Sequence, residues 1–382
     1  MSETIRTLQF GMGWFPEQAG GLNRVYYHLM KELPGAGVSV RGLVAGTPTD
    51  GAAARHGVDF FAPIATPLPV RWFRARTAAR EALSHGEVDL VASHFALYTF
   101  PALGPVTTRP LVVHFHGPWA LESAVEQDAG WYVRFKLAVE NAVYGKARLF
   151  IVLSEAFASV LRERYGVPAE RIRVVPGGAD VTRFGIDEPK EAARERLGWP
   201  SDRFVVLAVR RLAHRMGLEN LIDAMATVRR TAPEVMLYVA GKGPLAGALE
   251  ARIAERGLED HVRLLGFVPD EDLPAAYRAA DLTIVPTQSF EGFGLITVES
   301  LASGTPVLVT PVGGLPEVVR GLSPDLVLAG SNAAALAEGL TGAVSGTRRL
   351  PDAGACRAYT LENYTWASVA RRTRDVYREA LR

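Results

Sequence analysis

Cysteine is almost absent from this chain of 382 residues, and neither sign of charge is in excess. The single cysteine, Cys356, excludes an intramolecular disulfide and a zinc site built on several cysteines, and it is typical of a reducing compartment. The 42 basic and 41 acidic side chains give a net charge of +1. Because such a chain has no overall cationic field, we do not expect it to bind nucleic acid.

Long hydrophobic runs and export signals are also lacking. The longest uncharged run, residues 90–108, contains His94, Pro101, Gly104 and Pro105, which interrupt it before it could cross a bilayer as a helix. The first ten residues have no apolar core of the length that a signal peptide needs, so we expect a cytoplasmic protein. Lysine is scarce beside arginine, which together with abundant alanine hints at a GC-rich bacterial genome.

The chain does contain a regular alternation of short β-branched runs with longer amphipathic stretches. Apolar residues make up 48% of the sequence, and at about 150 residues per domain the length suggests two domains. The alternation is typical of βαβ units in a parallel sheet. We predict strands over residues 6–12, 38–45, 89–94, 111–116, 149–154 and 172–176, and over 204–209, 235–240, 262–267, 282–286, 306–310 and 325–328. The predicted fold class is α/β, with two Rossmann-like, doubly wound domains facing each other across a cleft.

A polar stretch containing a Pro-Gly-Gly turn interrupts the alternation over residues 177–189. We therefore place one domain at residues 1–182 and the other at residues 183–364. Residues 361–382 are predicted to form a final helix with Trp366, Val369, Val376, Tyr377 and Leu381 as its apolar positions.

Three glycine-rich turns stand between predicted strands and helices, at Gly20-Gly21, at Gly241 and in residues 310–317. Backbone amides at a helix N-terminus suit an anion, whereas a plain turn needs glycine only for its dihedral angles. Spacing alone leaves both interpretations open for the first and third turns and favours the plain turn at Gly241. The sequence contains no Walker loop, and Pro16 stands where the dinucleotide fingerprint requires a third glycine.

Two acids, Glu291 and Glu299, flank seven small or apolar residues. If the whole segment were helical, a separation of eight positions would bring both carboxylates to within about 80° of one face, where they could line a pocket. Sugar and ribose hydroxyls would be natural partners for such carboxylates. The alternative, slightly preferred on these residues alone, is that Glu291 caps the following helix and Glu299 pairs with an arginine.

His114 and His116 face the same side of a predicted strand, and His94 ends another. A metal pair lacks a third ligand at suitable spacing, so we expect one core histidine and a polar role near the cleft for His116, with a weaker case for His94.

A basic, aromatic stretch over residues 70–80 could contact an anionic lipid or acceptor. The commoner outcome is a surface helix with Trp72 and Phe73 buried.

In their order along the chain, these segments resemble the retaining GT-B glycosyltransferases of glycosyltransferase family 4 over essentially the full length. The matching segments are the Gly20-Gly21 turn, DLVASHFALYTFP, VVHFHGPWALES, VVPGGADVTRF, RRLAHRMGLENLI, GKGPL and the run from GFVPDEDL to GGLPEVV. In the last of these, Glu291 and Glu299 correspond to the two acids of the family's E-x7-E motif.

The resemblance implies that a sugar moves with retention, by front-face attack, from a nucleotide-diphosphate sugar such as a UDP- or GDP-sugar to an acceptor hydroxyl. It implies no metal and no further cofactor, and a C-terminal helix, residues 365–382, that packs back on the first domain. Arg211 would bind the diphosphate, Glu291 the transferred sugar, Glu299 the ribose, and His116 the sugar near its reacting carbon. The predicted catalytic residues are His116, Glu291 and Arg211, and the predicted donor-binding residues are Gly20, Gly21, Arg211, Arg215, Gly241, Gly294, Leu295 and Glu299.

The chain departs from the family at Met216, where the family has a lysine, and we expect Arg215 to replace that charge beside Arg211. The acceptor implied is a small molecule, a glycan or a lipid-linked molecule, with peripheral contact at the inner face of a membrane. Two alternatives remain: a nucleotide-sugar epimerase of the same fold, and a catalytically inactive nucleotide-sugar binding protein.

Overall fold

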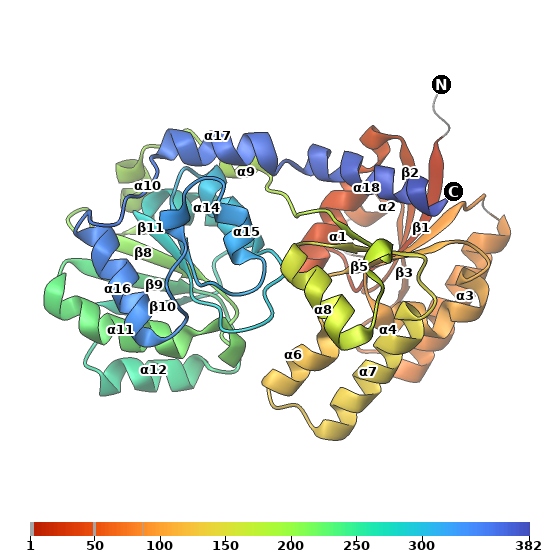
Figure 1. Ribbon diagram of the computed structural model, residues 1–382, viewed down its shortest axis with the longest axis horizontal. Coiled ribbons are helices and arrows are strands. Elements are labelled where there is room, and N and C mark those ends of the chain that lie inside the picture. The colour runs from red at the N-terminus through yellow and green to blue at the C-terminus, as the bar shows by residue number, and fades with distance from the viewer. Residues whose placement is uncertain (1–3, 49–50, 86) are drawn as a thin grey trace. The chain divides into compact units, whose positions relative to one another are not determined.

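The computed structural model describes residues 4–48, 51–85 and 87–382, and the chain divides into two compact units (Figure 1). Unit 1 consists of Met1–Gly178 and Trp366–Arg382, and unit 2 of Ala179–Thr365. The predicted domain boundaries, after residues 182 and 364, lie close to these divisions.

Unit 1 contains a parallel sheet whose described strands follow the order β3-β2-β1-β4-β5-β6-β7. The strands are β1 (Ile5–Phe10), β2 (Val38–Ala45), β3 (Val58–Ala62), β4 (Leu90–Ser93), β5 (Leu111–Phe115), β6 (Leu149–Val152) and β7 (Ile172–Val174). The helices are α1 (Gly21–Glu32), α2 (Ala52–Arg55), α3 (Leu68–His85), α4 (Ala96–Thr99), α5 (Leu103–Val106), α6 (Trp119–Val125), α7 (Gly130–Tyr144), α8 (Glu155–Tyr165) and α18 (Trp366–Ala380), with 3-10 turns η1 (Pro34–Ala36), η2 (Phe100–Ala102) and η3 (Ala169–Arg171). The strand order reverses between β1 and β4, and doubly wound sheets hold ligands at such a switch point, beyond the carboxyl ends of the strands.

Unit 2 contains a second parallel sheet, with described strands in the order β10-β9-β8-β11-β12. The strands are β8 (Phe204–Val209), β9 (Val235–Ala240), β10 (Val262–Gly266), β11 (Leu282–Val285) and β12 (Val307–Val309). The helices are α9 (Val181–Phe184), α10 (Lys190–Leu197), α11 (Leu218–Thr231), α12 (Ala246–Glu255), α13 (Leu273–Ala279), α14 (Leu295–Ala302), α15 (Leu315–Val319), α16 (Ala333–Val344) and α17 (Ala353–Asn363), with 3-10 turns η4 (His214–Met216) and η5 (Pro324–Leu326). Here the switch point lies between β8 and β11.

The sequence pattern explains these elements. Every residue of β9 and of β11 is buried, as expected for parallel strands that are covered on both faces. Helix α11 instead buries a single stripe at helical spacing, which includes Leu218, Leu221, Ile222, Met225 and Val228.

Three predictions about elements are wrong at particular places. Residues 325–328 do not form a strand, because the 3-10 turn η5 follows Ser323 and only an isolated bridge joins Val309 to Val327. Strand β3, which is short and lies at the edge of its sheet, is not predicted at all. The final helix begins at Trp366 rather than at residue 361, because α17 ends at Asn363 and Tyr364 is its C-cap.

Helix α18 completes unit 1 by returning to its sheet (Figure 1). It contacts α1, β5 and β6. The Trp366 indole stacks on the His28 ring at 4.6 Å between centroids, and the buried Tyr377 hydroxyl lies 2.7 Å from His114 Nε2. Two contacts thus join α18 to distant parts of the chain, one to α1 and one to the end of β5.

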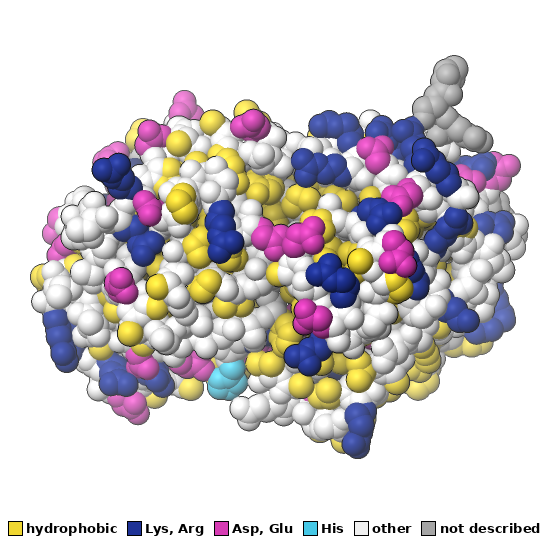
Figure 2. All heavy atoms as spheres, viewed as in Figure 1, with side chains coloured by type: hydrophobic (Ala, Val, Ile, Leu, Met, Phe, Trp, Pro, Cys, Tyr) yellow, Lys and Arg dark blue, Asp and Glu magenta, His cyan; other side chains and the backbone are white. Residues whose placement is uncertain are grey.

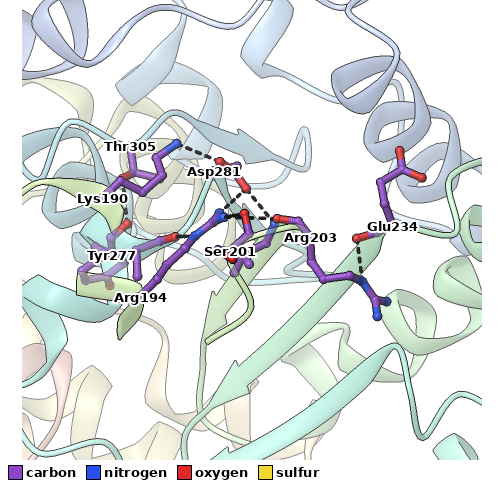
Figure 3. A network of polar contacts seen from close by, with 10 residues as sticks. Lys190, Arg194, Ser201, Arg203, Glu234, Tyr277, Asp281 and Thr305 are labelled. Atoms are coloured by element: carbon purple, nitrogen blue, oxygen red, sulfur yellow. Dashed lines mark hydrogen bonds and ion pairs between the residues drawn. The ribbon is translucent and has the colours of Figure 1, made fainter. Parts of the chain in front are cut away.

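A polar network anchors helix α10 to the sheet of unit 2 (Figure 3). Asp281, which precedes β11, accepts from Lys190 Nζ at 2.7 Å and from Arg194 Nη2 at 2.5 Å. Arg194 is buried and also donates to a backbone carbonyl at the end of α13, while the Thr305 hydroxyl donates to the Tyr277 carbonyl at 2.7 Å. These contacts fix the position of α13, which carries Tyr277.

Candidate functional site

Glu291 lies in the loop after β11, where it is paired with an arginine from the loop after β8. Arg210 Nη2 is 2.5 Å from Glu291 Oε2, and the two side chains are only 7% and 15% exposed. The Thr287 hydroxyl donates to the same carboxylate oxygen at 3.3 Å and accepts from Arg210. Because the sheet order reverses between β8 and β11, this pair spans the switch point of unit 2.

The sequence prediction placed a donor-binding cation at Arg211, whereas the structure brings its neighbour Arg210 to Glu291. Arg211 itself is exposed, since successive residues beyond a strand point to opposite sides. The sequence reasoning missed Arg210, although a signal was present. An arginine that directly follows a wholly apolar strand is prone to burial and then needs an acidic partner.

Arg215 contacts the Glu291 loop. It lies in η4 and donates from Nη1 to the Phe290 carbonyl at 3.0 Å. Phe290 has φ of 51°, a conformation that costs a non-glycine residue about 1–2 kcal/mol, so this bond helps to hold the loop. Met216, where the family has a lysine, is buried. Contact of Arg215 with a diphosphate stays a prediction.

Two glycines allow neighbouring loops to press against the backbone of this pair. A Cβ at Gly241 would lie 1.8 Å from the Arg210 carbonyl oxygen, and one at Gly313 would lie 2.0 Å from the Glu291 carbonyl oxygen. Both residues also have positive φ, of 146° and 56°. The positive φ of Gly241 agrees with the plain turn that spacing favoured, and the close approach to Arg210 is a second reason for glycine there. Contact of Gly241 with the donor stays a prediction.

The two predicted acids have different surroundings. Glu299 lies within α14 and is buried, and its Oε2 accepts from the Tyr277 hydroxyl at 3.1 Å. The helix begins only at Leu295, so the premise that a continuous helix carries both acids on one face is wrong. The alternative that Glu291 caps this helix is also wrong, because α14 has Gly294 as its N-cap, with φ of 73°, and no side-chain cap.

Several buried polar atoms around this loop lack a hydrogen-bond partner among the described residues. They are Arg210 Nε, Ser289 Oγ and Thr297 Oγ1. Buried polar groups in proteins are nearly always bonded, so each unpaired atom needs an explanation. A polar ligand that reaches the Glu291 loop would satisfy such atoms.

In unit 1, the predicted anion turn opens α1. Gly21 is the first residue of this helix, and Gly20 is its N-cap, with φ of 147° and no side-chain cap. Both residues are exposed, and a Cβ at either would meet no atom within 4 Å. The amides of the first helical turn therefore remain available to an external acceptor, which leaves the anion interpretation as a prediction.

The three predicted histidines form a column at the carboxyl edge of the unit 1 sheet. The His94 ring stacks on His114 at 4.0 Å and on His116 at 5.4 Å between centroids, and His94 Nδ1 lies 3.1 Å from His116 Nε2. Burial lowers the pKa of all three rings, that of His116 to about 4, so the column is neutral at physiological pH. The described part of the chain holds no cluster of three or more side chains suited to a metal ion.

The basic helix α3 has one aromatic residue packed inward and one pointing outward. Trp72 is half-buried and lies 5.3 Å from Phe100 between ring centroids. Phe73 is 70% exposed, so the expectation that it is buried is wrong. Basic and acidic side chains are interspersed over the face in Figure 2. None of the helices in the described ranges combines the length and the hydropathy that crossing a membrane requires.

Comparison with known proteins matches both halves of the chain to one enzyme class. Residues 19–183 match the family described as Glycosyltransferase Family 4, and residues 189–354 match Glycosyl transferases group 1. A D-inositol 3-phosphate glycosyltransferase of Nocardia farcinica is 34% identical over 360 residues, which is 90% of this chain and 76% of that protein.

Other relatives match over shorter stretches. A protein of the same name from Corynebacterium kroppenstedtii is 33% identical over 64% of this chain, and the match spans 56% of the relative's length. Mannosylfructose-phosphate synthase of Agrobacterium fabrum is 37% identical over 46% of this chain and 40% of the relative.

Solved structures share the fold over nearly the whole chain. Sucrose-phosphate synthase of Thermosynechococcus elongatus has a TM-score of 0.80 at 24% identity and covers 98% of both chains. HepE of Anabaena, solved with UDP and glucose, has a TM-score of 0.78 at 21% identity over 98% of this chain and 100% of its own. With two parallel α/β sheets, this likeness and the matches to both halves, the chain belongs to the group 1 glycosyltransferases of the GT-B fold.

Proposed function

We propose that this chain transfers a sugar from a nucleoside-diphosphate sugar to an acceptor hydroxyl, with retention at the anomeric carbon and without a metal ion. The observation that carries the proposal is the buried Arg210–Glu291 pair at the switch point of unit 2, near polar atoms that have no hydrogen-bond partner within the described ranges. A nucleotide sugar supplies both kinds of partner that these groups need. Its hydroxyls suit the carboxylate, and its diphosphate suits the arginines.

The leaving diphosphate gains negative charge in the transition state, so stabilisation depends on fixed positive groups near it. We assign this task to the exposed Arg211 and to the Arg210 Nε–H, which lacks a partner among the described residues. The amides of Gly294 and Leu295, at the uncapped start of α14, would add further donors. The solved HepE complexes with UDP and with UDP-glucose support a UDP-sugar as the first donor to test.

The two acids would then have separate tasks. Glu291, paired with Arg210, would hold hydroxyls of the transferred sugar. Glu299, with the Tyr277 hydroxyl already on one oxygen, would hold the ribose. His116 of unit 1, neutral and partly exposed, would contact a sugar hydroxyl near the reaction. For the acceptor, the names of relatives that are 33–34% identical make D-inositol 3-phosphate the first compound to test.

The test is to incubate the purified chain with UDP- and GDP-sugars, with and without D-inositol 3-phosphate, and to follow nucleoside-diphosphate release and the anomeric configuration of the product by NMR. We expect release and an unchanged anomeric configuration, both surviving EDTA. Glu291→Gln should lower kcat and Glu299→Gln should raise the donor KM, each about tenfold, since hydrogen bonds to charged groups contribute about 1.5–3 kcal/mol.

Other results would contradict the proposal in distinct ways. Loss of turnover with EDTA that Mn²⁺ or Mg²⁺ restores would refute metal independence, and an inverted product would refute retention. Conversion of the donor to an epimer without acceptor would point to an epimerase. Tight donor binding with neither hydrolysis nor transfer to any acceptor would point to a binding protein.

A further inference from the structure

The orientation of the hydrogen bonds around His116 can be traced back to a backbone carbonyl. The Thr7 hydroxyl donates its one hydrogen to the Ser39 carbonyl at 3.0 Å. Gln9 is the next residue in this series of hydrogen bonds, and its Nε2 lies 2.9 Å from Thr7 Oγ1. Because Thr7 has no second hydrogen to give, it must accept from the Gln9 amide nitrogen. The amide oxygen of Gln9 therefore faces His94.

The orientation of the Gln9 amide fixes which ring nitrogens of His94 and His116 carry hydrogen. His94 Nε2 lies 3.0 Å from Gln9 Oε1, which can only accept, so His94 Nε2 carries the hydrogen. The Nδ1 of a neutral His94 is then a lone pair, and it lies 3.1 Å from His116 Nε2. His116 must donate from Nε2, and its Nδ1 is left as a lone pair. That atom is buried and has no partner among the described residues, although the His116 ring as a whole is partly exposed.

The surroundings of the histidine column keep it neutral, the state in which His94 Nδ1 is a lone pair. The titratable groups packed against His94 are His114, His116 and Tyr26, whose ring lies edge-on at 5.0 Å, while Tyr377 bonds to Gln9 and His114. Burial lowers the pKa of the three histidines and raises the pKa of the two tyrosines. At neutral pH all of these groups are therefore uncharged.

We propose that Gln9 and His94 are positioning residues that keep His116 Nδ1 as a hydrogen-bond acceptor. His116 can then bind a substrate hydroxyl but not a phosphate oxygen. A hydroxyl can donate to this lone pair, whereas an ionised phosphate oxygen has no hydrogen to give and would face it with a second lone pair. A buried acceptor without a donor is costly, so a hydroxyl that reaches it also satisfies an unmet group. The identity of the hydroxyl rests on the proposed function, but the protonation form of His116 does not.

The first experiment needs no substrate and leaves both positioning residues, Gln9 and His94, unchanged. Ring-nitrogen NMR spectra of the full chain labelled with ¹⁵N-histidine distinguish protonated from bare nitrogens, and comparison with His116→Asn assigns the His116 signals. We expect a single form of His116, protonated at Nε2 and bare at Nδ1, from pH 8 down to about pH 6. A proton on Nδ1, or a mixture of both forms, would overturn the inference.

The second experiment perturbs the relay with a matched control. Gln9→Leu removes the acceptor that orients His94, so we expect both forms of His116 to be populated. Tyr377→Phe is the control. It removes a hydroxyl that is bonded to the same Gln9, but this hydroxyl is not one of the groups that link Thr7 through Gln9 and His94 to His116, so the protonated nitrogen of His116 should not change. If Gln9→Leu also leaves this form unchanged, Gln9 does not position the ring and the inference fails. Should Gln9→Leu not fold, His94→Leu tests the same link, with His94→Asn as the conservative variant that keeps an acceptor oxygen near the Nδ1 position.

Kinetics connects the relay to the proposed reaction. With donor and acceptor present, Gln9→Leu or His94→Leu should lower kcat about tenfold, the loss expected for one oriented hydrogen bond, and His94→Asn should recover part of it. Unchanged kcat in both leucine variants would refute the positioning role. If the wild-type chain shows the single His116 form but transfers no sugar, the proposed function fails while the assignment of the His116 form stands.

Discussion

The buried Arg210–Glu291 pair allows us to predict how much stability is lost when one of its two charges is removed. Its two side chains are 7% and 15% exposed, with 2.5 Å between Nη2 and Oε2. Removing one member of a buried pair costs about 3–5 kcal/mol, because the other charge stays buried without compensation. Since Glu291 retains the Thr287 hydroxyl and some solvent contact, we expect the lower end of this range, about 3 kcal/mol, for Arg210→Met. In the double variant with Glu291→Gln neither charge remains, so the coupling energy should be about 2 kcal/mol.

Native-state hydrogen exchange of the full chain can measure this coupling energy from peptides of unit 2. Exchange of β8 and β11 peptides against low urea gives the opening free energy around the pair, while β5 peptides of unit 1 serve as an internal control. We expect the β8 and β11 values to fall in each single variant and the β5 values to stay the same. A coupling energy below about 0.5 kcal/mol, typical of solvent-exposed pairs, would refute the view that the two charges hold each other in place.

Three further predictions follow from other contacts. Burial raises the pKa of Glu140 from an ordinary 4.5 to about 7, so between these pH values the folded state keeps a proton that the unfolded state loses. The free energy of unfolding should therefore fall by up to about 3 kcal/mol between pH 4.5 and 7, and urea titrations of Glu140→Gln should lack this pH-dependent component. Gly241→Ala places a Cβ 1.8 Å from a backbone carbonyl oxygen and should lower the Tm clearly, whereas Gly247→Ala, at an open helical position of the same unit, should leave the Tm unchanged or raise it. Equal Tm values for the two variants would show that close packing at Gly241 does not matter. If the acceptor is membrane-bound, the exposed Phe73 on the basic helix α3 should help the chain to sediment with anionic vesicles at low salt, and Phe73→Ala should reduce this; a wild-type chain that never sediments would favour a soluble acceptor.

The wrong predictions have local causes. The apolar run Leu326-Val327-Leu328 has the composition of a short buried strand, but Pro324 and the Ser323 side chain start a 3-10 turn there. Phe73 resembles a core residue by type, yet its position on α3 directs it outward while Trp72 packs inward. The type of a residue indicates whether it favours burial, but its position around the helix decides whether it is buried.

The sequence alone determined the α/β class, most of the strands and the family, because hydrophobic periodicity and short motifs are local properties of the chain. It placed Glu291, Glu299 and His116 among the candidate residues but could not supply their partners. Arg210 and Glu291 come from loops that follow neighbouring strands. Gln9 lies on β1, while His94 and His116 directly follow β4 and β5, and these three strands are neighbours only in the folded sheet. Which of two consecutive arginines turns inward, and which ring nitrogen carries a proton, depend on contacts between distant segments, so only the tertiary structure decided them.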